Sequence, residues 1–149
     1  MVTGTRVDPL VSVSFFVEVQ GVFTGTFRGC TGLGSQSEVI ENLAAGAGGV
    51  THIYKIPGVT RWTNIVLKRG VTDSMDVWAW RKQVEEGKVN EARKNGSIIM
   101  YDQTNTEVAR WNFENGWPAK ISGPNLDAST NEIAIEELEI AHEKLVREK

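Results

Sequence analysis

The sequence predicts a mainly β protein, a β-sandwich or open β-barrel of antiparallel strands with one flanking α-helix. Three observations predict this class. Apolar and polar residues alternate over Val11–Val19, turn signals separate several short segments of similar character, and one helical segment stands at about Ser74–Glu86. No repeat or linker divides the 149 residues, so we expect residues 1–149 to form a single domain.

Composition and charge argue against several classes of protein. The hydrophobic fraction is 40% and the charged fraction 23%, as in ordinary globular proteins. The formal net charge of −3 argues against a nucleic-acid-binding protein, which usually presents a basic face. No apolar run reaches membrane-spanning length, and the first residues lack a signal-peptide pattern, so we expect a cytoplasmic protein.

The first quarter of the chain predicts a hairpin followed by a loop. After the alternating segment, Gln20-Gly21 predicts a tight turn and Val22–Arg28 a return strand with Phe23 and Phe27 on one face. We expect Gly29–Gly34 to be a loop or bulge, because glycine weakens a strand interior.

A small, uncharged segment lies between two further candidate strands. Ser37–Leu43 predicts one strand, and Thr51–Ile56 predicts another that Pro57-Gly58 ends. The residues between them include Ala44, Ala45, Gly46, Ala47, Gly48 and Gly49. They lack the Gly-Lys-Ser/Thr ending of a P-loop and do not match GxGxxG, so we expect a flexible loop and no nucleotide cofactor.

The helix follows a strand over Asn64–Val71. Thr72-Asp73 offers an N-cap, and Gly87 is a suitable residue to end the helix. At about 100° per residue the helix has two apolar patches rather than one. The first contains Met75, Trp78 and Ala79; the second contains Val77, Trp80 and Val84.

One helix patch is expected to pack on the sheet, and the other needs a second partner. We take Val77, Trp80 and Val84 as the candidate subunit contact. The alternative is a helix covered on both sides within its own fold.

Aromatic residues mark the next strands. After a polar loop at Gly87–Asn95, the sequence predicts a strand pair over Ser97–Tyr101 and Glu107–Trp117. On the second strand one face carries Ala109, Trp111, Phe113 and Trp117. Alternating aromatics of this kind favour a core face over a sugar-binding platform.

Two structures compete for the C-terminal segment. Asn131–Lys149 is rich in helix-forming residues, which favours a helix. Ile133 and Ile135 nevertheless alternate, and a phase change near Glu136-Glu137 suits a bulged strand.

The sequence contains no catalytic or metal-ligating constellation. Cys30 has no nucleophile-activating partners and is expected to be a small, buried or partly buried residue. His52 and His142 lack ligand spacing, and the glutamates Glu136, Glu137, Glu139 and Glu143 have no supporting histidine or aspartate. We therefore expect no enzymatic activity, metal or cofactor.

Several motifs in order along the chain carry a family resemblance. They are IPG at Ile56–Gly58, LKRGVTDSMDVWAW at Leu67–Trp80, RWNFENGWP at Arg110–Pro118, SGPNLDA at Ser122–Ala128 and NEIAIEELEIAHE at Asn131–Glu143. Each is weak alone, but together they resemble the inner-tube proteins of contractile phage tails and phage-tail-like contractile injection systems. The resemblance covers the chain from Asp8-Pro9 to about Leu145.

The resemblance implies a structural subunit. Such subunits form hexameric rings that stack into a hollow tube inside a contractile sheath, assembled in the cytoplasm with baseplate and tube-terminating proteins, with cargo in or on the tube. It also implies a strand through about Glu143. Many relatives carry charge where this chain has LAAGAGG at Leu43–Gly49. We expect Leu43–Thr51 to be mobile in an isolated subunit and to order when rings stack.

A channel wall touching water and cargo is expected to be polar, and here acidic. On a strand Glu137 and Glu139 share one face and are the candidate channel-facing pair, with the sheath side or bulk solvent as the alternative. Two other functions stay open: a tube-initiating, baseplate-proximal ring subunit of the same fold, and a carbohydrate-binding β-sandwich.

Overall fold

The computed structural model describes residues 14–124, 128–129 and 134–149. Its strands are β1 (Ser14–Val19), β2 (Phe23–Phe27), β3 (Gly29–Thr31), β4 (Ser35–Ala45), β5 (Thr51–Trp62), β6 (Ile65–Gly70), β7 (Lys94–Tyr101), β8 (Glu107–Ser122), β9 (Ile135–Ala141) and β10 (Lys144–Arg147). Its helices are the short 3₁₀ helix η1 (Ala47–Gly49), α1 (Asp76–Glu85) and α2 (Val89–Ala92). The predicted mainly β, antiparallel fold class with a flanking helix is confirmed.

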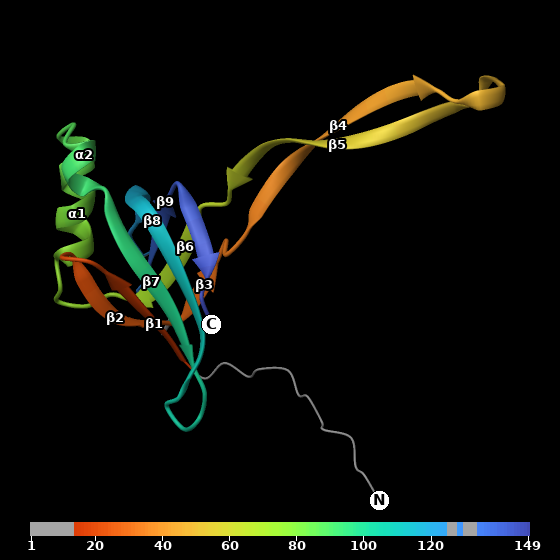
Figure 1. The fold of residues 1–149 in the computed structure, drawn as a ribbon. Helices are drawn as coiled ribbons and strands as arrows, with labels where there is room; N and C mark the ends of the chain where they lie inside the picture. Colours follow the sequence, from red (N-terminus) through yellow and green to blue (C-terminus); the bar gives the residue numbers. More distant parts are fainter. Residues whose placement is uncertain (1–13, 125–127, 130–133) are drawn as a thin grey trace, which may run out of the picture.

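Eight strands form one sheet that curls into a barrel. The order is β2-β1-β7-β8-β9-β6-β3, every pairing is antiparallel, and β10 continues β9 alongside β8. Only Arg28 separates β2 from β3, and its backbone N–H donates to the Lys68 carbonyl oxygen at 2.8 Å. This bond brings the two ends of the strand order together, and α1 and α2 lie at one side of the barrel (Figure 1).

The N-terminal hairpin follows its predicted alternation. Val17 and Val19 are buried while Glu18 is exposed, and Phe23 and Phe27 are both buried on the same face. Gly21 has φ of 73°, which glycine adopts without strain in the predicted turn. Val11 and Val13, also predicted for this strand, lie outside the described residues.

Three segments differ from the sequence expectations. Gly29–Thr31, expected in a loop, forms β3, because it pairs with Val66–Lys68 of β6. Strand β5 does not end at Pro57-Gly58 but continues to Trp62, because the pairing with β4 shifts between Ser37 and Val39 and a β-bulge tolerates proline. The polar segment after Gly87 contains α2 rather than only a loop.

The helix α1 begins and ends slightly inside its predicted bounds. The structure places it at Asp76–Glu85 rather than Ser74–Glu86. Its N-cap position is Met75, whose side chain makes no capping bond. Ser74 Oγ accepts from the backbone N–H of Asp76 at 3.4 Å, and Thr72 Oγ1 accepts from the backbone N–H of Ser74 at 3.3 Å. The N-cap expected at Thr72-Asp73 is therefore wrong by two residues.

The long strand β8 forms the centre of the core. Phe113 is 1% exposed, and its ring lies against the backbone of Gly96 and Gly116, where a Cβ atom would overlap it. Trp111 shares its face but is only partly buried, with the Arg147 guanidinium 5.5 Å from its ring centre. The predicted core face is therefore confirmed for Phe113 and only in part for Trp111.

A bulge reverses the face pattern beyond Phe113. Asn115 has φ of 54°, and after it Pro118 rather than Trp117 pairs with the buried Ile140. Trp117 lies opposite Ala141 on the other face. The expectation that Trp117 shares the core face is wrong, because the bulge adds one residue to the alternation.

From Ile135 onward the C-terminal segment forms strands β9 and β10, as the resemblance implied, and not the helix that its composition favours. Ile133, expected to alternate with Ile135, lies outside the described residues. The interruption of the segment lies at His142-Glu143, between β9 and β10, rather than near Glu136-Glu137. There the Glu143 carboxylate accepts hydrogen bonds from Asn115 Nδ2 at 2.8 Å and from Arg93. Both bonds lower the pKa of Glu143, the Asn115 bond more strongly.

We predict that Phe113→Ala lowers the free energy of unfolding by about 3–5 kcal/mol, because it empties a fully buried aromatic site. Trp111→Ala is expected to cost less, about 1–3 kcal/mol, because that ring is already partly in water. Urea unfolding of both variants measures the difference. Equal losses would contradict the observed difference in burial.

We predict that Glu143→Gln lowers the melting temperature at pH 7 more than at pH 3. The depressed pKa means that the carboxylate stabilises the fold above its ordinary pKa, and that this stabilisation is lost as pH falls through the lower folded value. Melting curves of parent and variant between about pH 7 and pH 3 test this. A difference that stays constant with pH would mean that the carboxylate's charge contributes nothing.

Candidate assembly surfaces

A long two-stranded hairpin projects from the barrel. Strands β4 and β5 pair with each other and with no other strand of the described chain, and Figure 1 shows them extending far from the body. Eight large hydrophobic side chains on it are exposed: Val39, Ile40, Leu43, Val50, Ile53, Tyr54, Ile56 and Val59. An exposed apolar surface of this extent marks an interaction site.

Residues Ala44–Gly49, the segment that we expect to contact the adjacent ring, form the tip of this hairpin. Ala44 and Ala45 belong to β4, opposite His52 and Thr51, so the strands extend further into the segment than expected. Ala47–Gly49 forms η1, closed by a hydrogen bond of 2.6 Å from the Gly46 N–H to the Val50 carbonyl oxygen.

Three glycines allow this tip to be narrow. Gly48 and Gly49 have φ of 78° and 77°, a left-handed conformation that favours glycine. A Cβ atom on Gly46 would overlap the His52 ring. The small residues predicted as a contact loop are thus needed for the shape of the turn itself.

The helix α1 packs against the core with the face that we expected to be free for a subunit contact. Val77 and Trp80 are 1% and 2% exposed and belong to the core, and Val84 packs against it. The indole N–H of Trp80 donates to the Ala92 carbonyl oxygen at 2.6 Å. Because α2 holds Trp80 in this position, Val77, Trp80 and Val84 are not a free subunit contact, and that prediction is wrong.

The other helix face carries a second exposed apolar surface. Met75 is 68% exposed and Trp78 38% exposed, and Val71 and Ile135 beside the starts of α1 and β9 are also exposed. We call these four residues the α1 patch.

A buried ion pair anchors the α1 patch to the barrel. Arg69 Nε lies 2.5 Å from Glu136 Oε1, and the second oxygen of Glu136 accepts from Trp78 Nε1 at 3.0 Å. Arg69 also lies 6.0 Å and 5.7 Å from the ring centres of Phe23 and Phe27. Sequence reasoning missed this pair because Arg69 and Glu136 meet only through the pairing of β6 with β9.

Glu137 and Glu139 share the outward face of β9, as their spacing predicted. Their cross-strand neighbours are basic: Lys68 pairs with Glu137, and Lys120 with Glu139. This face is therefore balanced in charge rather than acidic.

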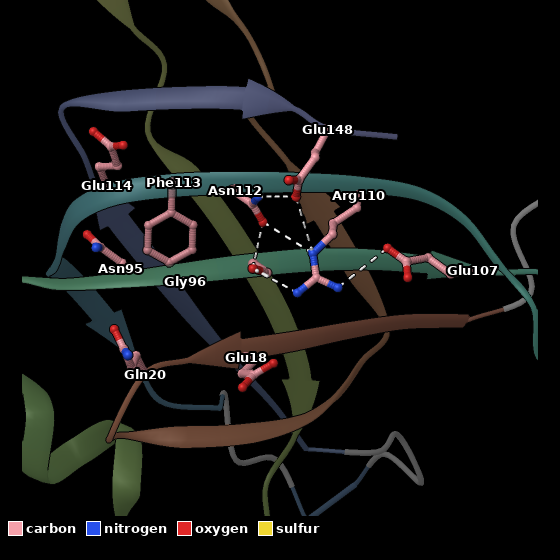
Figure 2. A pocket seen from close by; sticks show the side chains of 11 residues that line it. Glu18, Gln20, Asn95, Gly96, Glu107, Arg110, Asn112, Phe113, Glu114 and Glu148 are labelled. Carbon is pink, nitrogen blue, oxygen red and sulfur yellow. Dashed lines mark hydrogen bonds and ion pairs between the residues drawn. The ribbon is translucent and has the colours of Figure 1, made fainter.

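A different face of the barrel is acidic. Outside β1, β7, β8 and β10 lies an open hollow of about 610 Å³. Its lining includes Glu18, Glu107, Glu114, Glu148 and one arginine, Arg110, for a formal charge of −3. Figure 2 shows Arg110 at its centre, bonded to Asn112, Ser97 and Glu107.

The described residues contain no group of His, Cys, Asp or Glu side chains arranged to hold a metal ion. Burial raises the pKa of the Cys30 thiol to about 12, which keeps it protonated and unreactive. Glu136 points into the barrel, away from Glu137 and Glu139, so the glutamates of β9 form no cluster. No helix of the described chain is long and apolar enough to span a bilayer.

The barrel, the projecting hairpin and the exposed apolar patch together define a structural protein built for contacts between subunits. Residues 11–146 match the family model of the T4-like virus tail tube protein gp19, and the chain belongs to this family. No curated protein sequence matches the chain.

Solved structures of contractile particles share the fold. A chain in the sheath–tube complex of an extracellular contractile injection system (PVC) in the extended state is 26% identical, with a TM-score of 0.78 over 94% of this chain and 91% of that chain. A chain from the tube-terminating cap of the anti-feeding prophage is 23% identical, with a TM-score of 0.82 over 99% and 95%. A chain from the baseplate of that particle is 21% identical, with a TM-score of 0.78 over 95% and 97%.

We predict that Glu136→Ala lowers the free energy of unfolding by about 3–5 kcal/mol, because Arg69 is left charged and without its partner among buried groups. The adjacent Glu137→Ala is the matched control, since that side chain is exposed, and it is expected to change stability by less than about 0.5 kcal/mol. Chemical denaturation measures both. Equal effects would show that the ion pair contributes no more than a surface charge.

Proposed function

We propose that this protein is the repeating subunit of the inner tube of a contractile injection system or contractile phage tail. Membership of the tail tube family and the likeness to a chain of a sheath–tube complex support this role. The observation that carries it in this chain is the projecting hairpin, whose eight exposed apolar side chains require a partner. The tube has no enzymatic activity in this proposal.

Six subunits form each ring, as the family resemblance implies, and the rings stack into a hollow tube. The hairpin of one ring reaches the next, so the contact is heterologous and stacking continues without closing. A sheath surrounds the tube, and baseplate and terminating proteins are located at its two ends. Cargo is carried inside the tube or at its tip. Assembly takes place in the cytoplasm.

The channel wall is a polar sheet face. Glu137 and Glu139 are its candidates from the sequence, and their alternation away from the core supports this. The acidic hollow around Arg110 is the alternative wall, since it carries the larger negative charge. A cryo-EM structure of the assembled tube distinguishes them by which face borders the channel.

A tube-initiating, baseplate-proximal ring is the second candidate, because chains of a baseplate and of a cap share this fold as well as a chain of the tube complex. Such a subunit forms single rings and not long tubes. Electron microscopy of the purified protein, alone and with its neighbouring proteins, separates the two roles.

A carbohydrate-binding function has little support in this chain. Trp80 is buried, and the indole N–H of the exposed Trp78 is already bonded to Glu136. Tight glycan binding by a monomer in a glycan screen would favour it.

We predict that deleting Ala45–Gly49 leaves a folded subunit that still forms rings but gives short tubes or none. The deletion removes only the hairpin tip, which makes no core contact, and shortens the reach towards the next ring. Circular dichroism checks the fold, and negative-stain microscopy measures tube length.

The matched control is Ala47→Ser, a small substitution at the same exposed tip, which is expected to give normal tubes. Long tubes from the deletion would show that stacking depends on other surfaces.

A further inference from the structure

A cavity lies between β2 and the connection from β6 to α1. Its volume is about 470 Å³, within the range of small-molecule sites. One wall is formed by Thr24–Arg28, and the other by Arg69–Thr72 with Ser74 and Asp76. The cavity therefore opens at the N-terminus of α1, away from the acidic hollow around Arg110.

The charge of the lining is opposite in sign to that of the whole chain. Two arginines, Arg28 and Arg69, stand against the carboxylate of Asp76, for a formal charge of +1, whereas the chain carries −3. The Arg28 side chain is exposed and forms no hydrogen bond or ion pair with the described residues. A free guanidinium at a cavity wall is suited to a carboxylate or phosphate, whose oxygens accept its paired N–H groups.

The second arginine is held in place and keeps an unused donor. Arg69 Nε donates to Glu136 Oε1 at 2.5 Å, and the rings of Phe23 and Phe27 lie 6.0 Å and 5.7 Å from the guanidinium. The other oxygen of Glu136 is taken by Trp78. Arg69 Nη2 is buried and has no partner among the described residues. A buried donor without an acceptor destabilises the protein, and an oxygen of a ligand would supply that acceptor.

Hydroxyl groups and the helix terminus add further donors to the cavity. Thr72 Oγ1 and Ser74 Oγ each accept a backbone N–H, so each keeps its own O–H proton for a ligand. The N-cap residue Met75 makes no capping bond from its side chain. The positive end of the α1 dipole therefore also favours an anion here.

We propose that this cavity binds an oxyanion, a carboxylate or phosphate carried on an organic group. Arg28 pairs with the oxyanion, and the hydroxyls of Thr72 and Ser74 donate to it. The organic group fills the remaining volume, which is larger than a single inorganic ion needs. Asp76 repels the anion and limits its affinity. The inference does not depend on the proposed tube function.

Two substitutions with opposite expected effects test the site. Titration calorimetry measures the binding of inorganic phosphate to the unassembled full chain at constant ionic strength. Arg28→Gln is expected to weaken binding by about tenfold, because it removes a charged donor. Asp76→Asn is expected to strengthen binding by about threefold, because it removes a repelling charge.

Arg61→Gln is the matched control, because Arg61 is also exposed but does not line the cavity. It is expected to leave phosphate affinity unchanged, and circular dichroism confirms that all three variants are folded. An Arg28→Gln variant that binds phosphate as the Arg61→Gln control does overturns the proposal. So does the lack of saturable binding to the parent at phosphate concentrations up to about 20 mM.

The same measurements on assembled tubes identify the source of the oxyanion. If an acidic group of a neighbouring protein occupies the cavity, tubes bind phosphate more weakly than subunits, and Arg28→Gln raises the concentration needed for assembly. If the ligand is a free small molecule, tubes and subunits bind phosphate alike, and Arg28→Gln assembles as the parent does. Both results keep the oxyanion site. A chain that forms no tubes counts against the proposed function and leaves the subunit titration as the test of the cavity.

Discussion

The packing of Phe113 against bare backbone is the contact on which the rest of the structure depends. The ring fits because Gly96 on β7 and Gly116 on β8 present no side chain to it. Just beyond it the bulge at Asn115 lets β8 leave β7 and continue beside β9. One strand therefore belongs to both halves of the barrel, and the interior of each half forms around the same ring.

Local patterns predicted much of the barrel. The alternation through Val17 and Val19 and the turn at Gly21 depend on neighbouring residues only, and each was predictable. Strand β3 was not, because Gly29–Thr31 is a strand only through its pairing with β6. The continuation of β5 through Pro57 was missed for a similar reason, since the proline is accommodated by a bulge in β5, where Gly58 and Val59 lie opposite the single residue Glu38 of β4.

The hairpin tip and the helix faces were predicted only in part. The small residues of Ala44–Gly49 indicated a loop between two strands, but not that it is the end of a hairpin beginning at Ser35. The helix was predicted with two apolar patches, and its orientation was decided by α2, whose Ala92 accepts the Trp80 bond. A polar stretch such as that around α2 gives little sequence signal for a short helix.

A subunit with one long projection has a direction. In a stack of such subunits every hairpin points the same way, so the two ends of the filament differ chemically. One end exposes hairpins, and the other end exposes the apolar surfaces that hairpins would otherwise cover. The free energies of adding a subunit are equal at both ends, but the exposed surfaces that must be sealed are not. Two different proteins are therefore needed to terminate such a filament. One must present an apolar surface that covers the exposed hairpins, and the other must present an element that covers the apolar surface at the opposite end.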